Sequence, residues 1–314
     1  MFCIISLILY FVNIDSNRKK SFKRKMLRKI KSIDKWNEFE NIYSNIDLTK
    51  IKKKPRCNIL KTLLGCIIIM LDCTFFVIYI KNVNTLIVIL AVIIFAIGWF
   101  LITEKSSKYK TDIVKKFLSA INTNIQYDDN YFGDKLYKDS GFRDNISNKI
   151  TSTDYIEYKL GYDTNVKMLD LNLQYKVKTI RHSYTENIFE GIIAKITREQ
   201  YIDNEILIER NKFFKGNNRV KTDMPEFEKY FDIYAKDENT LEMILPSYVK
   251  EQILELYKTY GIMFEISMKG NDIFVRFFTG GLFEITSFSK RKLYKEYLIF
   301  TSILEIINKI NEIL

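Results

Sequence analysis

The sequence predicts an α+β protein in which a transmembrane helical hairpin precedes a cytoplasmic antiparallel or mixed β-sheet domain packed with helices. Three observations predict this class. Residues 62–80 and 84–103 form two long apolar runs, residues 150–285 carry the alternation and turn residues of strands, and the last 25 residues have helical periodicity. The net charge of +11 lies entirely in residues 1–61, because the remainder of the chain is neutral overall.

Residues 1–61 are expected to form a basic N-terminal arm. Its first segment, residues 1–14, is apolar but short for a membrane span, and no basic residue precedes it as a signal peptide would require. Three interpretations are open: a short third span, an anchor in the membrane interface, or an upstream extension with Met26 as the true start.

The basic residues next to the first apolar run are expected to contact anionic lipid headgroups, which attract each such residue by about 1 kcal/mol. Contact with nucleic acid and a role in setting topology alone are the alternatives. The residues concerned are Lys50, Lys52, Lys53, Lys54, Arg56 and Lys61.

Residues 62–103 are expected to form two membrane-spanning helices. Each apolar run is close to the roughly 20 residues that cross about 30 Å of hydrocarbon. Only a few residues around Lys81 connect the runs, which predicts an antiparallel hairpin. The alternative is a buried helical pair in a soluble protein. Lysines flank both outer ends, so the positive-inside rule places both arms in the cytoplasm and the protein in the plasma membrane.

Asp72 lies in the middle of the first apolar run. A central aspartate costs roughly 2.5–3.5 kcal/mol on membrane-insertion scales, and neither run contains a Lys or Arg that could pair with it. Two interpretations are open. Asp72 is an intramembrane assembly contact with the facing helix or another copy of the chain, or it is a tolerated acid without a role.

Residues 104–124 are expected to continue as a juxtamembrane helix, and residues 125–314 to form the cytoplasmic α+β domain. Strands are expected in NVKMLDLNLQYKV, IFEGIIAKIT and EILIERNKFF, and FDIYAKDENTLEMIL is interpreted as strand, polar turn and strand. Ser247 is expected to cap a helix that runs to about Tyr257. ISMKGNDIFVRFF is expected to form a hairpin with Gly270-Asn271 in the turn, and the chain closes with a helix.

The peptide MPEFEKYFDIYAKDENTLEMILPSYVKEQILEL, residues 224–256, resembles the central signature of a bacterial family of membrane proteins, domain of unknown function 3137. The matching positions include Pro225 to Lys229, Phe231 to Tyr234 and Leu245 to Ser247. The resemblance extends over roughly residues 30–314. It implies a two-helix inner-membrane protein with a cytoplasmic domain, and it carries over no activity and no catalytic residue.

Motifs of known chemistry are absent from the sequence. It contains no phosphate-binding loop, no dinucleotide-binding glycine motif, no nucleophile elbow and no zinc-protease motif. Its only histidine, His182, is expected to lie in a solvated turn, and its four cysteines include no CxxC pair. The sequence therefore predicts no catalytic residue, no cofactor and no metal ligand.

The preferred interpretation is a membrane-tethered, non-enzymatic binding or scaffold module of otherwise unknown function. Its expected partners are anionic lipid headgroups together with another protein or a second copy of the chain. No nucleic-acid partner is expected, because the domain after the apolar runs is neutral overall. The alternative is a membrane-bound enzyme whose site cannot be recognised from one sequence.

Overall fold

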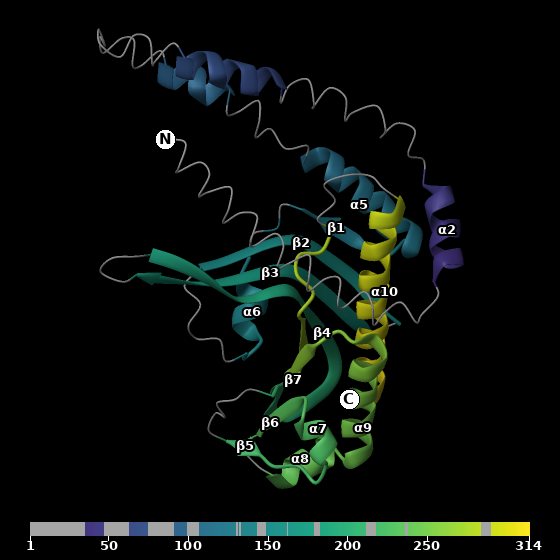
Figure 1. Cartoon of the computed structure of the whole chain (residues 1–314). Helices are drawn as coiled ribbons and strands as arrows, with labels where there is room; N and C mark the ends of the chain where they lie inside the picture. The colour runs from purple at the N-terminus through teal and green to yellow at the C-terminus, as the bar shows by residue number, and fades with distance from the viewer. Residues whose placement is uncertain are drawn as a thin grey trace. The chain divides into compact units, whose positions relative to one another are not determined.

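Figure 1 shows the computed structural model of the chain. It describes residues 35–46, 63–74, 91–98, 107–129, 131, 133–142, 149–161, 163–178, 183–211, 218–235, 238–283 and 290–314. Contacts divide the chain into two compact units, residues 1–41 with 121–314 and residues 42–120. In chain order the elements are α2 (Trp36–Asn45), α5 (Ser107–Ile121), β1 (Gln126–Asp128), α6 (Lys135–Asp139), β2 (Lys149–Leu160), β3 (Thr164–Lys178), β4 (Ser183–Arg210), β5 (Arg219–Val220), α7 (Pro225–Glu228), β6 (Phe231–Ala235), α8 (Glu238–Ile244), α9 (Ser247–Tyr260), β7 (Phe264–Phe277) and α10 (Lys290–Ile313).

The larger unit is built on an antiparallel sheet. Its strands follow the order β1-β2-β3-β4-β6-β5, and β7 pairs with β4. All of the pairings are antiparallel. The α+β class and the antiparallel sheet predicted for this part of the chain are therefore confirmed.

Strand β7 folds back on itself as a hairpin. Gly270 has φ +60°, a value that suits the first central position of a tight type II′ turn. The backbone N–H of Phe278 donates to the carbonyl of Met263 at 2.9 Å, which closes the open end of the hairpin. The hairpin predicted around Gly270-Asn271 is therefore confirmed.

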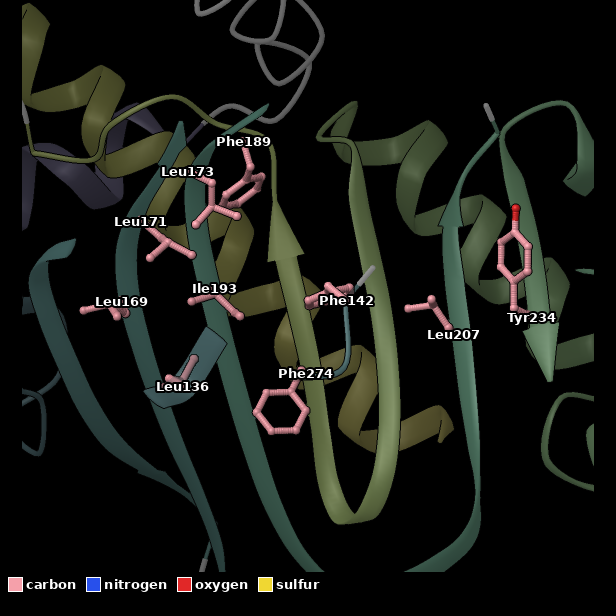
Figure 2. Close-up of a cluster of buried hydrophobic side chains, with 10 residues drawn as sticks. All are labelled: Leu136, Phe142, Leu169, Leu171, Leu173, Phe189, Ile193, Leu207, Tyr234 and Phe274. Atoms are coloured by element: carbon pink, nitrogen blue, oxygen red, sulfur yellow. The ribbon is translucent and has the colours of Figure 1, made fainter. Parts of the chain in front are cut away.

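Strand β4 encloses this hairpin with two arms of its own. Residues 192–197 pair with residues 272–277, while residues 206–208 pair with residues 266–268. Because the arms of β7 run in opposite directions, the two paired stretches of β4 must do so as well. The sheet therefore runs from β3 to the first arm of β4, then through both arms of β7 to the second arm of β4 and β6, as Figure 2 shows from left to right.

One face of the sheet carries a continuous hydrophobic cluster. Side chains from β3, β4, β6 and β7 point to the same side, where α6 and the residues after it cover part of them (Figure 2). The period of two along each strand places these residues on one face. The cluster consists of Leu136, Phe142, Leu169, Leu171, Leu173, Phe189, Ile193, Leu207, Tyr234 and Phe274.

The opposite face packs against α9. The ring of Phe231 on β6 lies 5.8 Å from the ring of Tyr257 on α9 and 5.7 Å from that of Phe264 on β7. Helices α9 and α10 contact each other (Figure 1). Aromatic contacts at such distances add to the apolar area that burial removes from water. The sheet thus has a covered core on both sides.

Helix α9 differs at both ends from the prediction. Pro246 occupies the N-cap position, whereas Ser247 is the first helical residue, and its hydroxyl donates to Asp223 at 3.0 Å. The expectation that Ser247 is the N-cap is therefore wrong. The helix runs on to Tyr260 because Gly261, at φ +63°, supplies the left-handed residue that ends helices readily.

The second strand predicted in FDIYAKDENTLEMIL is also wrong. Phe231–Ala235 forms β6 as expected, but Glu238–Ile244 forms the helix α8. A short apolar stretch such as TLEMIL has no period long enough to separate strand from helix. By contrast, the closing helix predicted for the last 25 residues is present as α10, Lys290–Ile313.

The transmembrane hairpin predicted for residues 62–103 is wrong. Among the described residues, no helix is long and apolar enough to cross a membrane. A helix rises about 1.5 Å per residue, so the prediction required two helices of about 20 residues each to cross about 30 Å of hydrocarbon. The plasma-membrane location and the multi-pass topology were inferred from those runs, so the same finding contradicts them.

Helix α2 begins with residues that pack against α10 within the larger unit. The ring of Trp36 lies 4.7 Å from that of Tyr294, and the ring of Phe39 lies 5.5 Å from that of Tyr297. Lys290 forms an ion pair with Glu40 beside these rings. The start of α2 is therefore part of the same compact unit as the C-terminal helix.

Candidate functional site

A row of buried charged residues crosses the sheet next to the hydrophobic cluster. It contains Arg276 and Glu265 on the two arms of β7, Glu209 on β4 and Asp232 on β6, and none of the four is more than 4% exposed. Glu209 and Asp232 are directly paired across their strands. Buried charges are stable only when they are paired and hydrogen-bonded, so their partners define what this row can do.

Arg276 neutralises one end of the row. Its Nε donates to Glu265, and its Nη2 lies 3.7 Å from Oε1 of Glu209. The guanidinium also lies over the ring of Phe142, 4.4 Å from its centre, and 5.6 Å from the ring centre of Phe189. A desolvated guanidinium gains from contact with aromatic faces. Arg276 thus hydrogen-bonds Glu265, pairs electrostatically with Glu209 and anchors the segment after α6.

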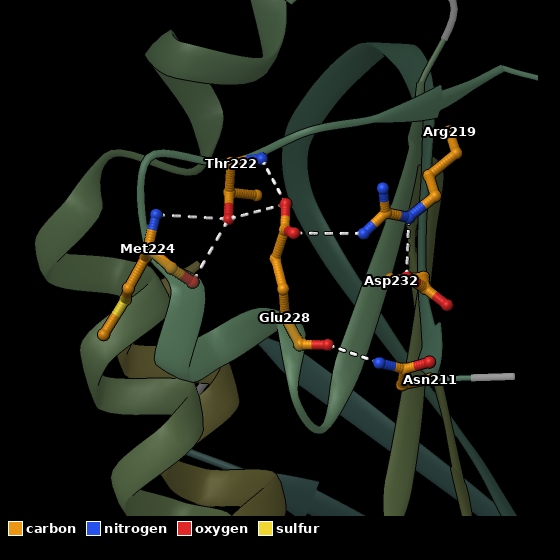
Figure 3. Close-up of polar contacts among 6 residues, drawn as sticks. All are labelled: Asn211, Arg219, Thr222, Met224, Glu228 and Asp232. Atoms are coloured by element: carbon orange, nitrogen blue, oxygen red, sulfur yellow. Dashed lines mark hydrogen bonds and ion pairs between the residues drawn. The ribbon is translucent and has the colours of Figure 1, made fainter.

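Arg219 neutralises the other end, as Figure 3 shows. Its Nε donates to Oδ1 of Asp232 at 2.7 Å, and its Nη2 lies 3.2 Å from Oε2 of Glu228. Oε1 of Glu228 accepts the backbone N–H of Thr222 at 2.6 Å. That hydrogen bond, and then the charge of Arg219, hold the pKa of Glu228 below its ordinary value.

Replacing Glu228 with glutamine should destabilise the protein, and the loss relative to the wild type should be larger at neutral pH than at acid pH. A carboxyl whose pKa is lowered by folding contributes stability above its unfolded pKa of about 4.3, and loses it as the pH falls through the folded pKa. We expect Glu228→Gln to cost about 1 kcal/mol at pH 7 and progressively less as the pH falls below the unfolded pKa of about 4.3.

Urea unfolding at pH 7, 5, 4 and 3 measures this difference. The exposed Glu251→Gln on α9 serves as the control and should change stability at none of these pH values. A Glu228→Gln difference that is constant from pH 7 to pH 3 would contradict the expectation.

The buried row is poorly suited to catalysis. Glu265 and Asp232 are bonded to arginines and shielded from solvent, so neither is free to exchange a proton with a substrate. In the part of the chain that the structure describes, no group of three His, Cys, Asp or Glu side chains could hold a metal ion. The row is best explained as an internal polar frame that fixes the relative positions of β4, β6 and β7.

A pocket of about 100 Å³ opens on the same face, one step along the strands from the charged row. Ser267 on β7, Leu207 on β4 and Tyr234 on β6 are cross-strand neighbours and line it. Glu205 and Lys269 also line it and form an ion pair at 3.1 Å. Gly141 and Asn218, both with positive φ, line it from two loops, and the remaining lining residues are Ile206 and Ala235.

A larger groove of about 610 Å³ lies between α9 and α10. Along α9 its lining combines aromatic and apolar side chains with polar ones, and Tyr248 at its edge is 62% exposed. The lining residues are Tyr248, Gln252, Glu255, Leu256, Thr259, Tyr260, Lys309, Glu312 and Ile313.

Two of the charged side chains in this groove pair with each other, and a third does not pair with either. Lys309 and Glu312 form an ion pair on α10 at 2.6 Å. Glu255 has no hydrogen bond or ion pair to any described residue. Burial and a hydrogen bond to Glu305 raise the pKa of Tyr260 to about 12. The groove therefore presents one unpaired carboxylate among aromatic and aliphatic side chains.

Asp72 lies on the helical stretch 63–74 of the smaller unit and is only 8% exposed. Its Oδ1 is shielded from solvent and has no hydrogen bond to any residue that the structure describes. The hydroxyl of Thr74 donates instead to the carbonyls of Met70 and Leu71. The assembly role of Asp72 stays a prediction.

Small residues bring the stretches 63–74 and 91–98 together. A Cβ on Gly98 would lie 2.7 Å from Cγ1 of Ile69 and 3.2 Å from the carbonyl oxygen of Gly65, so only glycine permits this approach. The large apolar side chains point outward instead. Those most exposed are Leu63, Leu64, Ile67, Met70, Leu71, Val92, Ile93, Phe95 and Ile97.

The other residues singled out from the sequence are not described by the structure. His182, residues 1–14 and the proposed lipid contacts Lys50, Lys52, Lys53, Lys54, Arg56 and Lys61 lie outside the described residues. Sequence reasoning missed the charged row and both cavities. Glu265 and Arg276 carried a signal, because the hairpin register predicted around Gly270-Asn271 places them opposite each other.

The fold and the two cavities define an α+β domain with an antiparallel sheet, a buried ionic row and a groove between two helices. Residues 187–312 match the model of a family described as "Protein of unknown function (DUF3137)". This match contains the peptide 224–256, so it supports the family resemblance, but it covers less of the chain than expected and does not show a two-helix membrane protein.

Other comparisons add little. No curated protein matches this chain. Among solved structures, the crystal structure of the mycobacterial trehalose monomycolate transport factor A, TtfA, is similar with a TM-score of 0.36 and 11% sequence identity. That similarity covers 60% of this chain and 86% of the other, and at this TM-score it carries no argument about fold or function.

Proposed function

We propose that this chain is a non-enzymatic binding module whose groove between α9 and α10 accepts a segment of another protein. The groove carries the proposal, because it is about six times larger than the pocket on the sheet and combines exposed aromatic surface with a free carboxylate. Amphipathic helices commonly bind in grooves between helices, through apolar side chains spaced three or four residues apart. The enzyme alternative has no comparable observation in its favour.

The charge of the groove defines the partner. Lys309 and Glu312 neutralise each other, which leaves the carboxylate of Glu255 as the unpaired charge. Tyr248 and Tyr260 offer aromatic faces to a cation in the same groove. The expected partner is therefore an amphipathic segment with an apolar side chain for Leu256 and Ile313 and a Lys or Arg for Glu255.

Defined peptides test this proposal by fluorescence anisotropy. We expect an amphipathic Leu/Lys helical peptide to bind the full chain, and its Leu/Glu counterpart and a scrambled Leu/Lys peptide to bind at least tenfold more weakly. Non-specific attraction would give the opposite order for the two charged peptides, because the chain carries a net charge of +11.

Two lysine substitutions on α9 locate the binding. Glu255→Lys should reduce binding of the Leu/Lys peptide at least tenfold. Glu251→Lys makes the same charge change on the same helix but outside the groove lining, and should leave binding within twofold. Equal losses from both substitutions, or equal binding of the ordered and scrambled peptides, would overturn the proposal.

A further inference from the structure

We propose that the pocket at Ser267 binds a small zwitterion, such as a free α-amino acid with a short side chain. This site is separate from the groove between α9 and α10 and does not depend on the function proposed for it. No residue lines both cavities.

The pocket is lined by the hydroxyl of Ser267, which is available to hydrogen-bond a ligand. Ser267 is only 5% exposed, and its hydroxyl makes no hydrogen bond to any described residue. Its neighbours on the same sheet face, Leu207 and Tyr234, are largely apolar. A nearly buried hydroxyl with no protein partner needs water or a ligand to satisfy it.

The loop opposite leaves that hydroxyl open. Gly141 has φ +72°, and a Cβ built on it would lie 3.5 Å from Oγ of Ser267. Most other residues would be strained in this conformation and would place atoms against the hydroxyl. Glycine therefore keeps the space above Ser267 free.

The ion pair between Glu205 and Lys269 supplies two opposite charges beside this hydroxyl. The two groups are 3.1 Å apart, and each side chain is about half exposed. An exposed pair of this kind contributes little to stability, so it can open at low cost. A ligand with a carboxylate and an ammonium group would then bond to Lys269 and Glu205 respectively, replacing one ion pair with two charge-assisted contacts.

The size of the pocket limits the ligand. A water needs about 10–15 Å³ of such space, so about 100 Å³ corresponds to roughly seven to ten water positions. That room suits glycine, alanine or serine, whose backbone carries both charges and whose side chain can face Leu207 or the hydroxyl of Ser267. A long side chain would not fit.

The direct test is a titration of the full chain with alanine, by calorimetry and ligand-observed NMR. Propionate and ethylamine, which each carry one of its two charged groups, are the comparison ligands. We expect saturable binding of alanine and at least tenfold weaker binding of both comparison ligands. Absence of saturable alanine binding, or equal binding of propionate, would overturn the proposal.

Substitutions assign the binding to this pocket. Glu205→Gln and Lys269→Gln should each weaken alanine binding at least tenfold, and Ser267→Val should weaken it too by removing the hydroxyl and narrowing the cavity. Lys258→Gln removes a similarly exposed ion pair, with Glu226, outside both cavities and should have no effect. Circular dichroism checks the fold of each variant. Folded Glu205→Gln and Lys269→Gln variants that bind alanine as the wild type does would also overturn the proposal.

Discussion

Replacing Arg276 with methionine is expected to lower the free energy of unfolding by about 3–5 kcal/mol, which is the usual cost of removing one partner from a buried ionic network. The substitution removes the guanidinium from the buried carboxylates of Glu265 and Glu209. Glu265 keeps the backbone N–H of Arg210 and the half-exposed Arg210 side chain, 3.7 Å away. The substitution also removes the contact with the ring of Phe142. Urea unfolding followed by circular dichroism measures the loss.

Two further variants separate the charge effect from the loss of packing. The double variant Arg276→Met with Glu265→Met should recover part of the loss, because a buried ion pair can be replaced by apolar side chains at little cost. Lys258→Met breaks an exposed ion pair with Glu226 and should cost less than about 1 kcal/mol. A loss from Arg276→Met no larger than that from Lys258→Met would contradict the role assigned to the row.

Replacing Gly191 with alanine should destabilise the protein by about 3 kcal/mol, at the upper end of the usual range for overpacking. A Cβ there would lie 1.9 Å from the carbonyl oxygen of Phe277 and 3.0 Å from the backbone nitrogen of Thr279. Both atoms belong to the backbone that leaves β7, so no side-chain rotation can relieve the contact. The chain would have to move away from β4 at this point.

Hydrogen exchange at Gly280 reports that movement, because its N–H donates to the carbonyl of Glu190 at 3.1 Å. We expect faster exchange at this amide in Gly191→Ala. Gly133→Ala provides the control, since the three atoms nearest its added methyl belong to the side chain of Tyr131 and not to the backbone. Unchanged stability and exchange in Gly191→Ala would show that β4 and the end of β7 are not in fixed contact.

The sequence predicted elements whose signals are local. The turn residues at Gly270-Asn271 and the helical period of the last 25 residues identified the β7 hairpin and α10 correctly. Residues 238–244 were misassigned as strand because a short apolar stretch carries no decisive period. The apolar composition of residues 62–103 predicted membrane spans, but among the described residues no helix is long and apolar enough to form one.

The charged row and the cavities depend on contacts between distant residues. In EILIER, Glu209 follows three consecutive apolar residues, and glutamate is rarely buried in proteins, so local composition gives no signal that it lies in the core. It is buried because β4 reverses direction and places it beside Asp232 and near Arg276. The groove likewise requires α9 and α10 to lie side by side, and no property of either helix alone predicts its neighbour.

The position of β7 within the sheet affects how the chain can fold during synthesis. Residues 264–277 lie between the two arms of β4, yet they leave the ribosome after every other described strand. Until they emerge, the inner edges of both β4 arms have unpaired backbone groups, which are prone to pair with other chains. The sheet can therefore close only late in translation, and nascent chains that stall before residue 264 should be the most prone to aggregate.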